Sequence, residues 1–496
     1  MSDLNFDAFQ PVTEPLPASV HMIGIGGAGM SGVARILLAR GVRVSGSDMK
    51  ESRAVIGLRA MGASIEIGHA VDNLEISGSL PDAIVVSFAA IPQDNPELAR
   101  AKELGIPVLK RSDVLAMLMR DNRALLIAGT HGKTSTTSMT VAALQAAGID
   151  PSFAVGGLMS KAGVNAHQGT GDVFVAEADE SDASLLTYAP QVAVVTNIEP
   201  DHLDFFGTEE KYFQVFDEFA KRLVDGGTLV VCAEDEHAAA LGERAVAEGL
   251  NVLAYGGPEA LKAHSSLPVG AELHGWTSIG GGAKIEATVM DTPVSFELQQ
   301  PGRHMALNAL AALVAGNCVD ADLARMARGL GEFTGVRRRF DYHGAVASGQ
   351  FEGARVYDDY AHHPTEVRAV LGAAREIVDD AKAGNVIAVF QPHLYSRTQN
   401  FSQEFAEALS LADKVIVLDV FGAREQPIPG VDGNLIAKDV TVPAIFEPHF
   451  ASAPERVAEI AASRDVILTI GAGSVTMLAD EILAELGSVK EDNAGV

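Results

Sequence analysis

The sequence has little of two things, cysteine and positive charge. Only two of its 496 residues are cysteines, Cys232 and Cys318, and they do not form a CxxC pair. This excludes a disulfide framework and a structural zinc site, and it favours a reducing compartment. The sequence contains 37 lysines and arginines but 65 acidic residues, so the formal net charge is -28. Because such a chain repels phosphate backbones and anionic lipids, neither nucleic acid nor a membrane surface is expected as a partner.

Long apolar runs are also missing. No stretch reaches the roughly 18 apolar residues that a membrane-spanning helix needs. The acidic segment 1–10 lacks the charged and then apolar pattern of a secretion signal. We therefore expect a soluble, cytoplasmic protein, with a polar tail at 489–496 that frays.

What the chain does have is enough length and apolar content for several domains. Its 496 residues are 47% hydrophobic and 21% charged, which suits about three domains of roughly 150 residues. Short apolar runs followed by longer amphipathic stretches recur, as in parallel sheets with crossover helices. We predict an α/β fold of three domains: an N-terminal Rossmann-like domain at 1–122, a central P-loop ATPase-like domain with a parallel sheet at 123–335, and a C-terminal Rossmann-like domain at 336–496.

The apolar runs locate the expected strands. The first unit should contain a strand at 20–25, a glycine turn, a helix at 30–40 and a second strand at 42–45. Further buried strands are expected at 83–87, 125–128, 173–176, 191–196, 355–357, 386–390, 414–418 and 466–470. Between 252 and 298 the sequence is rich in glycine, and we expect few strands there.

The most specific motif is the hexapeptide GTHGKT at 129–134, which follows an apolar strand and precedes a helical run. In such a loop the backbone N–H groups and the helix N-terminus bind phosphates. Lys133 would reach the β and γ phosphates, and the hydroxyl of Thr134 could bind Mg²⁺. Position 127 is Ile, so the loop is shorter than the general GxxxxGK[ST] pattern. A glycine turn without a ligand would not require a lysine and a threonine at these positions.

Two polar segments follow neighbouring apolar strands of the central domain: EADESD at 177–182 and NIEPDH at 197–202. Ligands of open α/β sheets bind at this carboxyl edge. Carboxylates and an imidazole beside a phosphate loop are suited to a divalent metal. Either segment alone would be better explained as a solvated acidic loop, but the phosphate loop in the same domain favours a metal site.

The N-terminal glycine turn, GIGGAG at 24–29, is followed about 20 residues later by Asp48. This pattern is typical of a dinucleotide site, with the diphosphate on a helix N-terminus and a ribose near the acid. A nucleotide sugar meets the same requirements, and a close-packed turn without a ligand is the alternative.

The C-terminal domain offers polar groups at two strand ends, DDYAHHP at 358–364 and QPH at 391–393 with Arg397. They could bind a carboxylate or a phosphate, or could cap loops. The basic run at 337–339 is either solvated or, in so acidic a chain, an ATP contact.

Seven blocks carry a resemblance that spans nearly the whole chain. They lie at 21–32 (HMIGIGGAGMSG), 129–137 (GTHGKTSTT), 177–185 (EADESDASL), 196–204 (TNIEPDHLD), 301–308 (PGRHMALN), 358–366 (DDYAHHPTE) and 391–398 (QPHLYSRT). In this order they resemble the Mur ligase family of peptidoglycan synthesis. The N-terminal blocks are similar to those of the members that add alanine.

The resemblance implies an enzyme that uses ATP and Mg²⁺ to join L-alanine to the lactyl carboxylate of UDP-N-acetylmuramate through an acyl phosphate. By matching position, catalysis would rest on Lys133, Glu177, His202, His362 and Arg397, with Mg²⁺ bound by Thr134, Glu177 and His202. ATP would be bound by Gly129, Thr130, His131, Gly132, Lys133, Thr134, Ser135, Asn308, Arg339 and Asp359. The UDP sugar would be bound by Gly26, Gly27, Ala28, Gly29, Asp48, His69 and Ser87. A monomer or homodimer is expected, with domain closure about the junctions near Arg123 and Arg337.

Met305 and Leu394 depart from residues common in the family blocks, which weakens the implied contacts at those two positions. Three other functions stay open. A recycling ligase would attach a whole peptide to the same UDP sugar. A nicotinamide-dependent oxidoreductase would explain the first glycine turn and Asp48 but not the loop at Lys133. A nucleotide-sugar sensor or ATPase switch would not need the acidic cluster.

Overall fold

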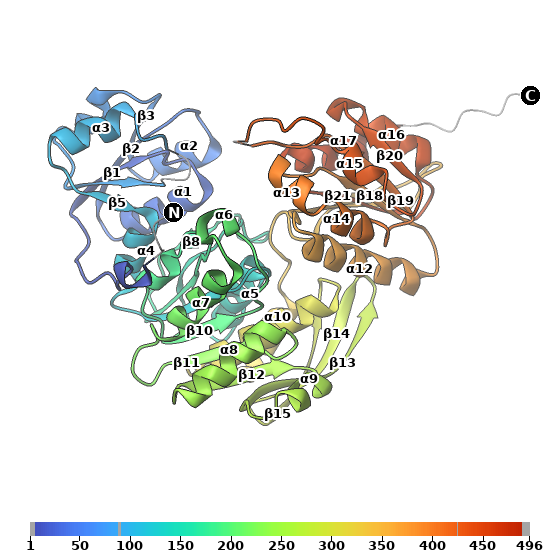
Figure 1. Ribbon diagram of the computed structural model, residues 1–496, viewed down its shortest axis with the longest axis horizontal. Coiled ribbons are helices and arrows are strands. Elements are labelled where there is room, and N and C mark those ends of the chain that lie inside the picture. The colour runs from blue at the N-terminus through green and yellow to red at the C-terminus, as the bar shows by residue number, and fades with distance from the viewer. Residues whose placement is uncertain (1–4, 88–90, 424, 489–496) are drawn as a thin grey trace, which may run out of the picture. The chain divides into compact units, whose positions relative to one another are not determined.

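The computed structural model describes residues 5–87, 91–423 and 425–488. It contains three sheets, each covered by helices, which confirms the predicted three-domain α/β class (Figure 1). The described residues form two compact units: one lies within 1–274, 286–295 and 307–331, and the other within 275–285, 296–306 and 332–496. The domain boundaries at 122 and 335 stay predictions. Of the helices in the described ranges, none has the length and apolar character to cross a membrane.

The N-terminal sheet is a five-stranded parallel sheet with the order β3-β2-β1-β4-β5. Its strand order reverses beside the fully buried β1, so a crevice is expected at the carboxyl ends of β1 and its neighbours. Ser52 and Asn95 cap the helices that follow β2 and β4, with side chains that accept backbone N–H groups. The elements are η1 Phe6–Ala8, β1 Ser19–Ile23, α1 Ala28–Ala39, β2 Arg43–Asp48, α2 Arg53–Ala60, β3 Ser64–Ile67, η2 Val71–Glu75, β4 Ala83–Val86, α3 Pro96–Glu103 and β5 Val108–Lys110.

Helix α4 (Arg111–Met119) connects the first two sheets. It packs against α1 of the N-terminal domain and against η3 (Ser184–Thr187) of the central domain. Nearly all of its side chains are buried. This packing explains why the two domains belong to one compact unit.

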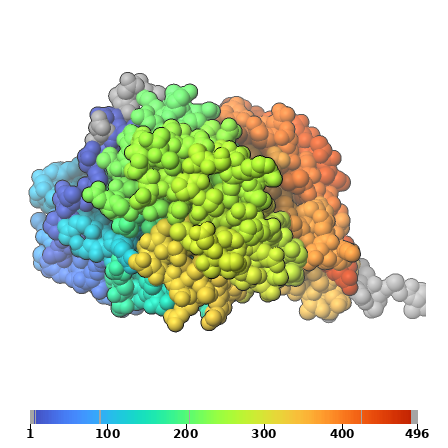
Figure 2. Space-filling model, turned by 90° about the horizontal axis from the view of Figure 1, so that it is seen from below, coloured from blue at the N-terminus to red at the C-terminus, as the bar shows by residue number. Residues whose placement is uncertain are grey.

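The central sheet is larger and more mixed than predicted. Its order is β15-β14-β13-β12-β11-β10-β6-β9-β7-β8, and the core strands from β12 to β7 are parallel, while β8 is antiparallel to β7. Helices α7 and α8 belong to the part of the surface drawn in green in Figure 2. The elements are β6 Arg123–Ala128, α5 Lys133–Ala146, β7 Ser152–Ala154, β8 Ala166–His167, β9 Val173–Glu177, β10 Val192–Val195, α6 Leu203–Phe206, α7 Glu209–Ala220, β11 Thr228–Cys232, α8 Glu236–Ala247, β12 Asn251–Gly256, α9 Pro258–Ala263, α10 Arg303–Asn317 and α11 Leu323–Gly331.

The expectation of few strands between 252 and 298 was wrong. Most of β12 lies there, followed by β13 (Val269–Ile279), β14 (Gly282–Val289) and β15 (Thr292–Leu298). Gly280 and Gly281 have positive φ and connect β13 to β14, so these glycines serve a tight turn between strands. In β14 the side chains of Ile285, Ala287 and Val289 are buried at alternate positions, as one-sided strands require.

The C-terminal sheet has the order β16-β17-β21-β18-β19-β20, with β16 antiparallel to an otherwise parallel set. Helices α12 (Pro364–Ala381), α14 (Ser402–Leu409) and α15 (Asn434–Ala437) contribute to one core, and α16 (Ala453–Ile460) and α17 (Leu478–Ser488) to the other. The remaining elements are β16 Asp341–Ala345, β17 Arg355–Asp359, β18 Val386–Phe390, α13 Tyr395–Asn400, β19 Lys414–Leu418, β20 Ala444–Glu447, η4 Phe450–Ser452, β21 Val466–Ile470 and η5 Ser474–Met477.

Candidate functional site

The loop from Gly129 to Gly132 connects β6 to α5 at the carboxyl edge of the central sheet. Gly129 has φ +123°, and a Cβ placed on it would lie 2.2 Å from Oγ1 of Thr196, so this position requires glycine. In the adjacent parallel strands, Ile127 pairs with Glu177 and Ala128 pairs with Val195. Both acidic segments predicted from the sequence therefore begin beside the loop.

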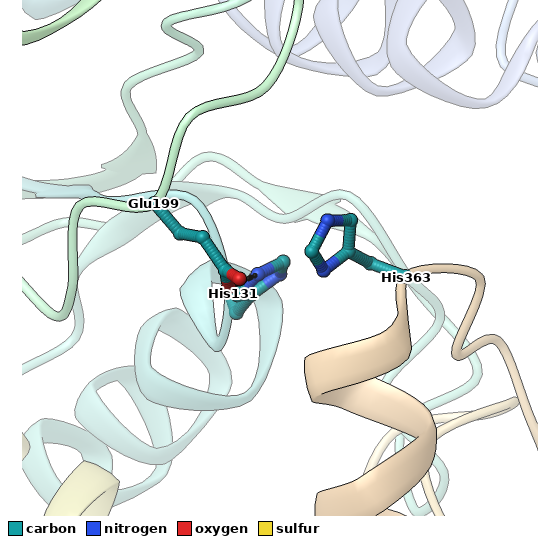
Figure 3. A group of neighbouring side chains, drawn as sticks. All are labelled: His131, Glu199 and His363. Atoms are coloured by element: carbon teal, nitrogen blue, oxygen red, sulfur yellow. Dashed lines mark hydrogen bonds and ion pairs between the residues drawn. The ribbon is translucent and has the colours of Figure 1, made fainter. Parts of the chain in front are cut away.

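The segment after β10 fixes the shape of this loop. The side chain of Asn197 accepts a hydrogen bond from the backbone N–H of His131 at 2.8 Å, and its amide donates to the carbonyl of the same residue at 3.0 Å. Nε2 of His131 lies 2.9 Å from Oε2 of Glu199, and Figure 3 shows the two side chains pointing toward each other. Oγ1 of Thr130 bonds with the hydroxyl of the buried Tyr212 at 2.8 Å. The loop is thus held in one shape by protein contacts alone.

Lys133 is held by a carboxylate that sequence reasoning missed. Its Nζ donates to both oxygens of Glu180 at 2.8 Å and to the carbonyl of Gly129 at 2.6 Å. Burial opposes the charge of the ammonium group, but the carboxylates of Glu180, Asp179 and Glu177 outweigh it and raise the pKa of Lys133. Lys133 is therefore a cation in a cluster that carries more negative than positive charge.

The predicted metal ligands differ in how closely they approach this cluster. Glu177 is near enough to raise the pKa of Lys133, and its Oε1 accepts a hydrogen bond from the backbone N–H of Gly156 at 2.6 Å. Thr134 is buried in the first turn of α5. His202 has φ +53°, and its Nε2 lies 3.7 Å from Oδ2 of Asp201, with which it forms an ion pair when protonated. The metal role of His202 stays a prediction.

The predicted contacts of ATP beyond the loop include Asn308, which lies on α10. A Cβ placed on Gly132 would be 3.2 Å from Oδ1 of Asn308, so this side chain rests directly against the phosphate loop. Ser135 is buried in the first turn of α5, and its contact with ATP stays a prediction.

The residues predicted to bind the UDP sugar lie at the carboxyl edge of the N-terminal sheet. Gly26 to Gly29 form the turn into α1, and the backbone N–H of Gly26 donates to Oδ2 of Asp48 at 2.9 Å. Asp48 ends β2 and pairs with Ile67 of β3, which places His69 two residues beyond that pair. Ser87 follows directly after β4. The structure therefore gathers all these residues along one edge.

Arg111, at the start of α4, is a second residue that sequence reasoning missed. A Cβ placed on Gly29 would lie 3.1 Å from its side chain, and its Nη2 is 4.0 Å from Oδ2 of Asp179. The guanidinium group thus connects the glycine turn of α1 to the acidic segment beside Lys133. No local sequence motif identifies Arg111, because the contacts of its side chain depend on how α4 packs.

The C-terminal candidates form their own group. Asp359 accepts the backbone N–H groups of Phe340 and Ala361 at 2.7 Å, and burial raises its pKa to about 6. Burial also lowers the pKa of His362 to about 4, an effect that Glu366 opposes and nearby Arg397 and Arg339 reinforce. His362 is consequently a neutral imidazole at physiological pH.

Two of the three arginines at 337–339, Arg338 and Arg339, are partly buried, whereas Arg337 is exposed as in an ordinary solvated basic run. The guanidinium group of Arg338 donates to the carbonyls of Gly471 and Gly473, and it lies 4.6 Å from the ring centroid of Tyr360. Arg339 approaches the same ring at 5.1 Å. These contacts place the run at the carboxyl edge of the C-terminal sheet.

Comparison with known proteins follows the same three-part division. The chain matches the Mur ligase family catalytic domain over 19–123, the Mur ligase middle domain over 127–316 and the Mur ligase glutamate ligase domain over 338–473. A UDP-N-acetylmuramate–L-alanine ligase of Nocardia farcinica is 56% identical over 477 residues, which cover 94% of each chain. The protein of that name from Mycolicibacterium smegmatis is 55% identical over 479 residues, 96% of each chain.

Solved structures agree with these matches. The crystal structure of UDP-N-acetylmuramate–alanine ligase from Thermotoga maritima superposes with a TM-score of 0.74 and 28% identity, covering 95% of this chain and 99% of that one. A murein peptide ligase from Psychrobacter arcticus has the same fold, with a TM-score of 0.66 and 21% identity over 95% of this chain and 99% of that one. The three family matches in chain order, together with relatives that align over almost their full length, establish that this chain belongs to the Mur ligase family.

Proposed function

We propose that this protein joins L-alanine to the lactyl carboxylate of UDP-N-acetylmuramate at the expense of ATP, as a step of peptidoglycan precursor synthesis. The observation that carries the proposal is the arrangement around Lys133: a phosphate loop after β6 whose lysine lies among the carboxylates at the end of the neighbouring strand β9. Relatives named for this activity that are 53–56% identical over nearly the whole chain support the choice of substrates.

The chemistry proceeds in two steps. A carboxylate oxygen of UDP-N-acetylmuramate attacks the γ-phosphorus of ATP, the bond to the β-γ bridging oxygen breaks, and an acyl phosphate and ADP form. The alanine amine then attacks the acyl carbon, loses a proton, and inorganic phosphate leaves with the oxygen that bridged carbon and phosphorus. Phosphoryl transfer needs positioning and charge neutralisation more than a dedicated base.

In this proposal the central domain binds the triphosphate. The N–H groups of the loop and of the first turn of α5 receive the phosphates, and Lys133 exchanges Glu180 for the γ phosphate. Asn308 supports the loop from α10. The cost of separating Lys133 from Glu180 is offset by the charge of the phosphate, which is as negative as the carboxylate that it replaces.

The acidic cluster fits Mg²⁺ by its donor set. Glu177, Asp179 and Glu180 supply hard carboxylate oxygens around a single lysine, and Thr134 adds a hydroxyl. We propose Thr134, Glu177 and His202 as the residues that hold the ion. When bound, it would neutralise charge on the phosphates of ATP.

The remaining substrates are assigned to the outer domains. We propose that the glycine turn of α1 binds the diphosphate of the UDP sugar and that Asp48, His69 and Ser87 bind its nucleoside. In the C-terminal domain, Arg339 and Asp359 would contact the adenine nucleotide, while Arg397 and the neutral His362 would bind the amino acid and the intermediate. Use of ATP is the basis on which we predict a cytoplasmic location; a monomer or homodimer stays a prediction.

The test is an assay of the purified protein with ATP, Mg²⁺, UDP-N-acetylmuramate and an amine. We expect ADP release to require both the UDP sugar and L-alanine, and the product to gain the mass of one alanyl residue. The recycling alternative predicts instead that a tripeptide is the better amine. Hydrolysis of ATP without an amide product would refute the ligase assignment.

A further inference from the structure

A buried polar cluster lies at the edge of the N-terminal sheet that is proposed to bind the nucleoside, and apart from His69 none of its residues has a role in the function proposed above. Its centre is Glu97, which is fully buried in the first turn of α3. We call the side chains that surround its carboxylate the Glu97 cluster; they are His21 on β1, Ser47 on β2, His69 after β3 and Asn73 in η2.

Three groups donate hydrogen bonds to the carboxylate of Glu97, and His21 lies within hydrogen-bond distance of it. Oε1 accepts the side-chain amide of Asn73 at 2.6 Å and the backbone N–H of Ala70 at 3.1 Å. Oε2 accepts the hydroxyl of Ser47 at 2.6 Å and lies 3.2 Å from Nε2 of His21. Burial opposes ionisation, but hydrogen bonds from these side chains outweigh it and lower the pKa of Glu97. Glu97 is therefore a carboxylate that acts only as an acceptor.

This direction of donation fixes the tautomer of His69. Because the Ser47 hydroxyl gives its proton to Glu97, its oxygen can only accept from Nδ1 of His69, which lies 2.9 Å away. The direct distance from Nδ1 to Oε1 of Glu97 is 3.7 Å, too long for a hydrogen bond, so the serine is the connection. A neutral His69 with its proton on Nδ1 carries a lone pair on Nε2. Among the described residues, no hydrogen-bond partner of Nε2 of His69 is seen.

The position of His69 indicates what Nε2 meets. In the sheet order β3-β2-β1, the diphosphate turn follows β1, Asp48 ends β2, and His69 follows β3. Neighbouring strands are about 4.8 Å apart, so the three strand ends match the order of diphosphate, ribose and base along a nucleotide. His69 is at the end of this order where the base would lie, and its side chain is 14% exposed.

We propose that Glu97, through Ser47, holds His69 as the Nδ1–H tautomer, so that Nε2 accepts a hydrogen bond from the N3–H group of uracil and selects uridine over cytidine nucleotides. This rests on the proposed function, since it assigns base recognition to the same nucleotide-sugar site. Cytosine carries an unprotonated N3, so its lone pair would face that of His69. Glu97 and Ser47 are then positioning residues that act through His69.

The test compares two serines of the same strand. Ser47→Ala removes the link to His69, whereas Ser45→Ala, the matched control, removes an equally buried hydroxyl that contacts His21 at 3.0 Å instead. Calorimetric titration with UDP and with CDP gives the selectivity ratio of each variant. We expect this ratio to fall by about tenfold in Ser47→Ala, the effect of one hydrogen bond, and to stay within about twofold of wild type in Ser45→Ala. An unchanged ratio in Ser47→Ala would overturn the proposal.

Nitrogen-15 NMR of the imidazoles provides a readout that a merely structural role would not move. We expect the wild-type protein to show His69 protonated on Nδ1, and Ser47→Ala to show a mixture of tautomers. A wild-type His69 protonated on Nε2, or on both nitrogens, would overturn the proposal even if Ser47→Ala folds poorly. If the protein forms the alanyl product but Ser47→Ala retains its selectivity, this inference fails and the proposed function stands; failure to bind any UDP sugar would remove both.

Discussion

Replacing Lys133 by methionine should separate its catalytic role from its structural one. The Lys133–Glu180 pair is buried, with side-chain exposures of 18% and 2%. Removing one partner of such a pair costs about 3–5 kcal/mol, because the other charge is left in a dry site. For a domain of about 200 residues, 3 kcal/mol corresponds to roughly 6–12 °C in Tm. Lys133→Met should therefore melt well below wild type as well as lose ligation.

The double variant Lys133→Met/Glu180→Gln is the decisive comparison. It leaves no uncompensated carboxylate at this position, so most of the lost stability should return while ligation stays absent. Burial raises the pKa of Glu180. In Lys133→Met the carboxyl of Glu180 gains a proton on folding, so the folded state loses stability as pH rises through the folded pKa of Glu180. The loss of Tm relative to wild type should therefore be smaller in acid. Melting curves over a pH series and an ADP-release assay measure the two effects. Equal Tm values for the single and double variants would refute the buried pair, and ligation by Lys133→Met would refute the role of the loop.

Three further predictions concern other parts of the molecule. Gly129→Ala should abolish ATP binding in an equilibrium titration, because the new Cβ collides with Thr196 at the end of the neighbouring strand. The control Gly41→Ala, also at positive φ but with open space around it, should bind ATP normally. Equal ATP affinities of the two variants would contradict the steric argument. Burial raises the pKa of Glu376 from its ordinary value of 4.5 to about 7, so the folded protein loses stability as pH rises from 4.5 through 7. Glu376→Gln should therefore melt above wild type at alkaline pH but not near pH 4. A Tm difference between the two proteins that does not depend on pH would contradict the raised pKa. Because the side chain of Arg111 lies against the glycine turn proposed to bind the diphosphate, we expect it to contact that diphosphate. Arg111→Met should then raise the KM for the UDP sugar by about tenfold or more, the effect of one charge-assisted hydrogen bond. The control Arg35→Met, which changes an arginine farther along α1 from this turn, should leave that KM unchanged; a matching effect in both variants would refute a contact between Arg111 and the diphosphate.

The strands of the C-terminal sheet illustrate what the sequence can predict. β18, β19 and β21 lie at the predicted positions, because strands buried on both faces are short apolar runs with polar flanks. The sequence does not predict β13 to β15, because the glycines between 252 and 298 argue against regular structure. Two of these glycines, Gly280 and Gly281, form a turn between strands, and β14 keeps its alternating pattern.

The site was predictable at the level of segments but not of every partner. The loop at 129–132 and the acidic segment 177–182 were both identified. Which carboxylate faces Lys133 depends on the turn after β9, where Asp179 accepts the backbone N–H of Ser181. Glu97 and Arg111 could not be found from local pattern, because each acts on residues far away in the sequence and its partners are set by helix packing.

The central claim, that ATP activates the muramyl carboxylate, is tested most directly by following oxygen. UDP-N-acetylmuramate labelled with oxygen-18 in its lactyl carboxylate would be converted with ATP and L-alanine, and the released phosphate analysed by mass spectrometry. An acyl phosphate predicts one labelled oxygen in each phosphate, with ADP as the other product. Unlabelled phosphate alongside the alanyl product would contradict it.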